Sequence, residues 1–193
     1  MTLSEVMATL PGDDPEAIPE IIRKYENPAS PDALPGAVAL ERHDCIHAML
    51  GRGLRLQDEA FVIGFTMGAA SDINEMHLAT FEYVSVQDYP EPFNFKPDHL
   101  LAFRLGVGAA FDMSPNTDIH LFPMEERMEL KLGDLRSRFG IKAPELRAYF
   151  RQEELLLPGS RSTRRLDTSA QREDVHLVAP EGKPSGWKRK KRH

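Results

Sequence analysis

The segment 58–70, DEAFVIGFTMGAA, constrains the fold of this chain most, because it is almost uniformly apolar after its two leading acids. A helix that is apolar all round is stable only when other elements bury it. Helical spacing of apolar residues recurs on both sides of this segment, at 36–50, 73–86, 98–113, 124–140 and 143–155. There is no alternation of strand and helix patterns and no run of period-2 strands. We therefore predict an all-α fold, a single domain of about six helices around the apolar one.

Helix ends are also readable in the sequence. Pro35 suits the first turn of the first helix, and Gly51 suits its C-terminal end. Ser71 or Asp72 is expected to cap the helix that follows the apolar segment. These signals predict that a short turn separates the first helix from the apolar one.

Composition divides the chain into three parts. Residues 1–34 are rich in proline, glycine and acids, and we expect turns with one short helix near residues 20–25. Residues 35–157 form the predicted helical, metal-binding domain. Residues 158–193 carry little to bury and are expected to be a disordered tail. The last eleven residues hold six of the 24 Lys and Arg and no acid, which leaves the rest of the chain at −12.

The charge and cysteine content indicate a location and exclude one class of partner. Cys45 is the single cysteine, and the N-terminus lacks the features of a signal or transit peptide, so the expected location is cytoplasmic. Trp187 and the five basic residues after it can bind an anionic membrane surface, which would place the protein peripherally on the inner membrane. A solvated tail is an equal alternative. Nucleic acid is not an expected partner, because the folded part is acidic.

Four polar residues carry the strongest indication of chemistry. His43 and His47 are four residues apart, which puts them within about 40° of each other around a helix. Asp44 is about 100° from His43 and can reach the same ion only from the flank. If the chain reverses near Gly51, Glu59 comes level with His47. Such a set suits Zn²⁺, with Fe²⁺ or Mn²⁺ as alternatives.

Other interpretations of these residues stay open. With seven histidines in 193 residues, a pair at this spacing also arises by chance, and the acids can be solvated helix residues. The zinc-protease motif H-E-x-x-H fits poorly, because Asp44 replaces its glutamate. The phosphohydrolases named for a His-Asp doublet need a histidine upstream, whereas His43 is the first in the chain. A metal-dependent hydrolase is therefore the least favoured class.

The pattern H-D-x-x-H-x(11)-E, formed by His43, Asp44, His47 and Glu59, resembles the zinc-binding signature of the coenzyme Q (ubiquinone) biosynthesis protein 4 family. The segments DEAFVIGFTMGAA, FRLGVGAAFDM and LFPMEERMELKLGDLRSRFGI are similar to later helices of that family, so the resemblance covers 35 to about 142. It implies that these four residues are metal ligands.

The same resemblance implies a function in quinone synthesis. The expected activity is that of a lyase: C1 decarboxylation, coupled to hydroxylation, of a polyprenylated hydroxybenzoate. The alternative is a non-catalytic scaffold or prenyl-lipid-binding protein that organises other quinone-biosynthesis enzymes. Gly64 and Gly68, four apart in the apolar helix, can serve tight core packing, a polyprenyl channel or a homodimer seam.

Overall fold

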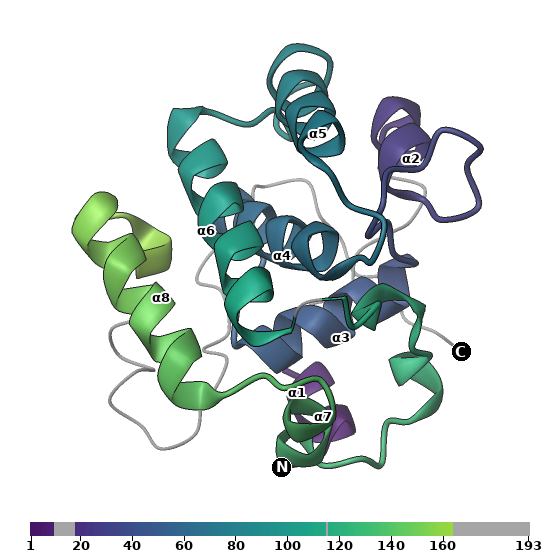
Figure 1. Ribbon diagram of the computed structural model, residues 1–193, viewed down its shortest axis with the longest axis vertical. Coiled ribbons are helices and arrows are strands. Elements are labelled where there is room, and N and C mark those ends of the chain that lie inside the picture. Colours follow the sequence, from purple (N-terminus) through teal and green to yellow (C-terminus); the bar gives the residue numbers. More distant parts are fainter. Residues whose placement is uncertain (10–17, 115, 164–193) are drawn as a thin grey trace.

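Helix α4 (Leu56–Ala69) lies at the centre of the molecule, and most of its residues are buried (Figure 1). The computed structural model describes residues 1–9, 18–114 and 116–163. In these ranges the chain forms one all-α domain without strands, which confirms the predicted fold class. The other helices of the described ranges are α1 (Leu3–Met7), α2 (Glu20–Glu26), α3 (Leu40–Leu50), α5 (Glu75–Gln87), α6 (Pro97–Met113), α7 (Leu132–Arg138) and α8 (Ala143–Leu156), with 3-10 turns η2 (Ile119–Leu121) and η3 (Met124–Glu126).

Helices α4 and α6 cross in direct backbone contact. A Cβ atom on Gly64 would lie 2.1 Å from the carbonyl oxygen of Phe103. A Cβ atom on Gly106 would lie 2.1 Å from the carbonyl oxygen of Phe61, so the contact is reciprocal. Only glycine permits this approach, and it brings the two longest apolar helices together in the core.

The first predicted helix begins later than expected. Residues 36–39 are not helical, and α3 starts at Leu40. Gly36 has a φ of +86°, and a Cβ atom there would lie 2.6 Å from the backbone of Met67. The segment therefore runs closely over α4 before α3 begins, and Pro35 lies outside the helix. The predicted end is correct, because Gly51 takes a left-handed φ of 66° after α3.

The helix predicted over 124–140 is interrupted. The structure has η3 and α7 instead, separated by non-helical residues. The backbone N–H groups of Leu3 and Ser4 donate to the carbonyl oxygens of Leu130 and Met128, both at 2.9 Å. In a continuous helix these two carbonyl groups would accept hydrogen bonds from N–H groups of the same helix, whereas here they accept them from the N-terminal residues. Leu3 is also buried in the core. Farther along this N-terminal part, the short helix predicted near residues 20–25 is present as α2.

Two further boundaries differ from the prediction. Asn74, rather than Ser71 or Asp72, caps α5, and its side chain accepts a hydrogen bond from the His77 N–H. Residues 158–163, predicted to begin a disordered tail, are described, and Ser162 is buried there against the body. The rest of that predicted tail, 164–193 with its basic end, lies outside the described residues.

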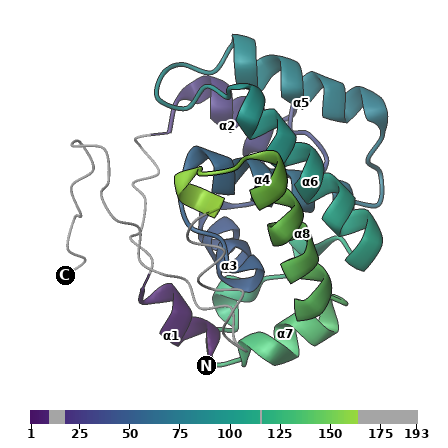
Figure 2. The same ribbon diagram turned by 90° about the vertical axis from the view of Figure 1, so that its left-hand side faces the viewer.

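Figure 2 shows that α2 and α5 lie together at one end of the molecule, with α1 and α7 at the other. No helix in the described ranges is both long and apolar enough to span a membrane.

Candidate metal centre

Helix α3 and the first turn of α4 bring three of the predicted ligands to one point. His43 Nε2 lies 2.9 Å from Glu59 Oε2, and His47 Nε2 lies 3.2 Å from the same oxygen. The two Nε2 atoms are 2.9 Å apart. The turn that Gly51 starts, in which the Arg52 N–H donates to the His47 carbonyl oxygen, makes this convergence possible.

The three separations fit a bound cation. Ligands about 2.0–2.1 Å from a tetrahedral Zn²⁺ are separated by about 3.3 Å. The separations of 2.9, 2.9 and 3.2 Å among His43, His47 and Glu59 are slightly shorter. A neutral imidazole carries one proton on its two nitrogens. When both rings are neutral, the two Nε2 atoms and the carboxylate oxygen that face one another therefore include more hydrogen-bond acceptors than donated protons. The group can therefore hold a metal ion.

Electrostatics within the group also favour a cation. Burial raises the pKa of Glu59, but the charges and hydrogen bonds of His47 and His43 outweigh it and hold that pKa well below its usual range. Burial lowers the pKa of His43, and the hydrogen bond and charge of Glu59 more than reverse this, so the net pKa is raised. The carboxylate is therefore ionised, and a divalent cation would displace a proton from His43.

Asp44, the fourth predicted ligand, does not join this group of donor atoms. It is buried on α3, and its burial raises its pKa, while the charges of His47 and His43 offset part of the rise. Its neighbouring position on the helix turns its carboxylate to the flank of the site, about 100° from His43. The structure brings together three of the four predicted residues, and the ligand role of Asp44 stays a prediction.

The candidate site opens into a cavity of about 870 Å³. His43 and Glu59 line this cavity, whereas His47 is fully buried behind them. Most of the wall is apolar. Examples of the apolar lining are Ile22, Val38, Leu56, Ile63, Met67 and Phe95.

Two polar residues that the sequence analysis missed lie in the same wall. Tyr89 follows α5, and its hydroxyl group donates a 2.7 Å hydrogen bond to Glu26 Oε1 at the end of α2. Burial is the main cause that raises the pKa of Glu26 to about 7. The two residues are 63 positions apart, so only a predicted contact between α2 and α5 could have revealed them.

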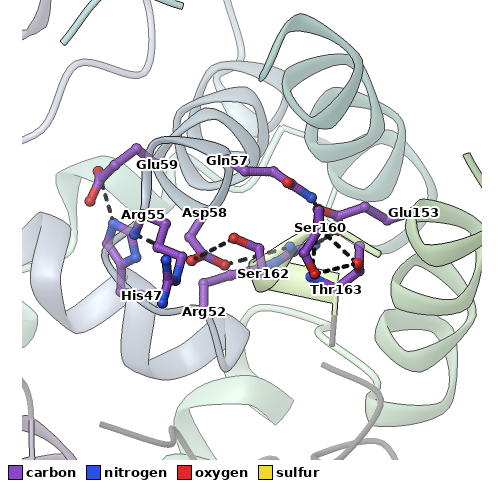
Figure 3. A network of polar contacts seen from close by, with 10 residues as sticks. All are labelled: His47, Arg52, Arg55, Gln57, Asp58, Glu59, Glu153, Ser160, Ser162 and Thr163. Atoms are coloured by element: carbon purple, nitrogen blue, oxygen red, sulfur yellow. Dashed lines mark hydrogen bonds and ion pairs between the residues drawn. The ribbon is translucent and has the colours of Figure 1, made fainter. Parts of the chain in front are cut away.

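A buried ionic network lies on the other side of the α4 N-terminus (Figure 3). Arg52 is fully buried, and its Nη2 lies 2.6 Å from Glu153 Oε2 on α8. Its Nη1 lies 3.9 Å from Asp58 Oδ1. The Gln57 amide donates to Glu153 Oε1 at 2.5 Å, and the Ser162 hydroxyl group donates to Asp58 Oδ2 at 3.3 Å. The network ties the turn after α3 to α4, α8 and Ser162.

The fold and the site define an all-α protein in which a group of two histidines and one carboxylate, at the wall of an apolar cavity, could hold a cation. Comparisons of the chain with protein-family models, curated proteins and solved structures find no match.

Proposed function

We propose that this chain is a metal-dependent protein of ubiquinone biosynthesis that acts in C1 decarboxylation and hydroxylation of a polyprenylated hydroxybenzoate. The observation that carries the proposal is the placement of His43 and Glu59 in the wall of the apolar cavity. Ligand sites commonly combine an apolar wall with a few polar groups that orient the ligand. A polar ring with an apolar tail suits this combination. The assignment to quinone synthesis rests on the resemblance of the H-D-x-x-H-x(11)-E pattern to the signature of the coenzyme Q biosynthesis protein 4 family.

The donor set decides which ion the site would hold. Two imidazoles and a carboxylate suit Zn²⁺, and Fe²⁺ or Mn²⁺ are alternatives. Once bound, such an ion supplies a Lewis acid that neutralises developing negative charge on a substrate oxygen. His47 holds the inner side of the site because it is fully buried. His43 and Glu59 are the donors at the cavity wall, so a fourth ligand from the substrate would approach beside them.

The chemistry sets one more requirement. Replacing a ring carboxyl group by a hydroxyl group releases CO₂ and removes two electrons from the ring. The reaction therefore needs an oxidant. With O₂ in that role it balances when water supplies the hydroxyl oxygen, the carboxyl group leaves as CO₂ and O₂ takes up the two electrons and two protons as H₂O₂. The apolar wall would bind the prenyl tail and keep bulk water from the ring.

Metal content of the full-length chain tests the first part of the proposal. Protein purified without chelator or histidine tag is expected to contain about one divalent metal ion per chain by mass spectrometry. His47→Ala is expected to lose that ion, because His47 supplies the buried donor. His77→Ala removes a histidine outside the group and is expected to retain it. Absence of metal from the parent protein, or equal content in both variants, would refute the metal site.

Turnover tests the second part. Carboxyl-labelled, prenylated 4-hydroxybenzoate is expected to release labelled CO₂ in the presence of O₂ and the metal-loaded protein. Glu59→Gln keeps the side-chain volume, removes the negative charge, and is expected to abolish the release while the circular dichroism spectrum is retained.

The cavity also supports a second candidate, a prenyl-lipid-binding protein that acts without catalysis. Glu59→Gln distinguishes the two. If the variant still supports quinone synthesis in cells and binds prenylated ligands as tightly as the parent, the non-catalytic function is favoured.

A further inference from the structure

Glu26 and Tyr89 form a polar pair in the wall of the cavity that also contains His43 and Glu59. The Tyr89 ring is buried, with an edge-on contact to Phe81. Its hydroxyl proton is donated to Glu26 Oε1. The second carboxylate oxygen of Glu26, Oε2, has no hydrogen-bond partner among the residues that the structure describes. The pair therefore presents hydrogen-bond acceptors to the cavity.

Stability does not explain this pair. Among the described residues, Glu26 has no ion pair with Lys or Arg. A half-buried carboxyl group without a cation costs free energy, and an apolar side chain would fit the surrounding wall better. Burial accordingly raises the pKa of Glu26 to about 7, and the charges of His43 and Glu59 act on it as smaller causes. Perturbed groups of this kind in a cavity are candidates for ligand recognition.

We propose that Glu26 and Tyr89 form a second polar subsite of this cavity, which accepts a hydrogen bond from a hydroxyl group on an aromatic ligand. The subsite rests on the proposed function in one respect, that the cavity holds a ring with an apolar substituent. The ligand would then be fixed at two places, by the donors on α3 and α4 and by the pair on α2 and after α5. Two polar contacts orient a planar ring where one would let it rotate.

A pair of esters tests the subsite. Butyl 4-hydroxybenzoate and butyl benzoate share the ring and the apolar chain and differ only in the hydroxyl group. Their dissociation constants are measured by calorimetry on the full-length, zinc-loaded protein. At about pH 8, above the pKa of about 7 of Glu26, the acceptor is mostly charged, and a hydrogen bond to it predicts that the hydroxy ester binds about tenfold more tightly. Glu26→Met keeps the length of the side chain and removes both acceptors. It is expected to abolish the preference while butyl benzoate binds as before.

Two further variants complete the design. Glu41→Met removes another glutamate that lines the cavity, on α3, and is expected to retain the tenfold preference. Tyr89→Phe removes the phenol oxygen alone and is expected to reduce the preference even if Glu26→Met folds poorly.

The outcomes separate the subsite from the proposed function. Equal binding of the two esters by the parent protein, or an unchanged preference in Glu26→Met, overturns the subsite and leaves the metal-dependent function standing. Binding of neither ester overturns the subsite together with the premise that the cavity holds a ring with an apolar substituent, while metal content and turnover still test the metal-dependent function. A preference that depends on Glu26 in a protein without metal supports the subsite and removes the metal-dependent function.

Discussion

Replacing Arg52 by methionine is expected to destabilise the protein strongly. The guanidinium group is fully buried between the rings of Phe61 and Phe150, 3.5 and 4.5 Å from their centroids. It lies 2.6 Å from Glu153, as an ion pair rather than a well-aligned hydrogen bond, and 3.9 Å from Asp58. Both carboxylates are themselves fully buried. Methionine fills most of the space between the rings but removes the cation that pairs closely with Glu153.

The expected cost follows from that burial. Removing one partner of a buried ion pair costs about 3–5 kcal/mol, because the remaining charge has lost its compensation. The unfolding free energy of a typical domain is about 5–15 kcal/mol, so this cost is a large fraction of the total stability. With a urea dependence of about 2 kcal/mol per molar, the unfolding midpoint would fall by about 1.5–2.5 M. The assay is urea unfolding followed by circular dichroism, with chelator present in every sample.

A double-mutant cycle and a surface control identify the cause. The double variant Arg52→Met/Glu153→Met removes one carboxylate together with the cation. Its loss of unfolding free energy is therefore expected to be smaller than the sum of the losses in the two single variants. Arg104 also faces two glutamates, Glu82 and Glu75, but it is 40% exposed, and Arg104→Met is expected to cost less than about 1 kcal/mol. A cost for Arg52→Met as small as that of the control, or strictly additive losses in the cycle, would refute this account.

Two other predictions follow from the site and the core. Because the pKa of His43 is raised above the ordinary histidine value of 6.5, protons compete with the metal for this side chain already at pH values above 6.5. Once His43 is protonated, the apparent zinc affinity is therefore expected to fall by about tenfold for each unit by which the pH is lowered. The affinity is measured by competition with a chromophoric chelator between pH 8 and 6, and an affinity that does not change with pH contradicts this prediction. Gly64→Ala places a Cβ atom 2.1 Å from the Phe103 carbonyl oxygen and is expected to cost about 3 kcal/mol. Gly133→Ala, with nothing within 4 Å of the added atom, should change the unfolding free energy by about 1 kcal/mol or less, and similar effects of the two would contradict the close helix contact.

Local sequence signals were sufficient to predict the helical class and the clustering of three of the four candidate ligands. The apolar character of 58–70 predicts a central helix, and α4 is that helix. The spacing of His43 and His47 puts both on one face of α3, and Gly51 starts the turn that brings Glu59 to them. These relations span at most 16 residues and depend only on helix geometry.

The features that the sequence did not indicate depend on contacts between distant segments. Arg52 lies between two glycines, a local pattern that is typical of an exposed loop. In the structure it is buried against Glu153, about 100 residues away in the sequence. Leu3 and Ser4 interrupt the predicted 124–140 helix through backbone pairing that leaves no side-chain pattern. Glu26 and Tyr89 meet only because α2 and α5 lie together. In each case a long-range contact outweighs the local preference.

The buried network and the candidate metal centre share the first turn of α4. Asp58 and Glu59 are consecutive, so their side chains leave the helix about 100° apart, one toward Arg52 and the other toward His47 (Figure 3). Arg52 directly follows the glycine that ends α3. Arg52 therefore contacts both helices: its backbone N–H donates to the His47 carbonyl oxygen at the end of α3, and its guanidinium group pairs with Asp58 at the start of α4. Donors held in this way need to move apart only slightly to meet a cation, so little of the free energy of binding would be spent on ordering them.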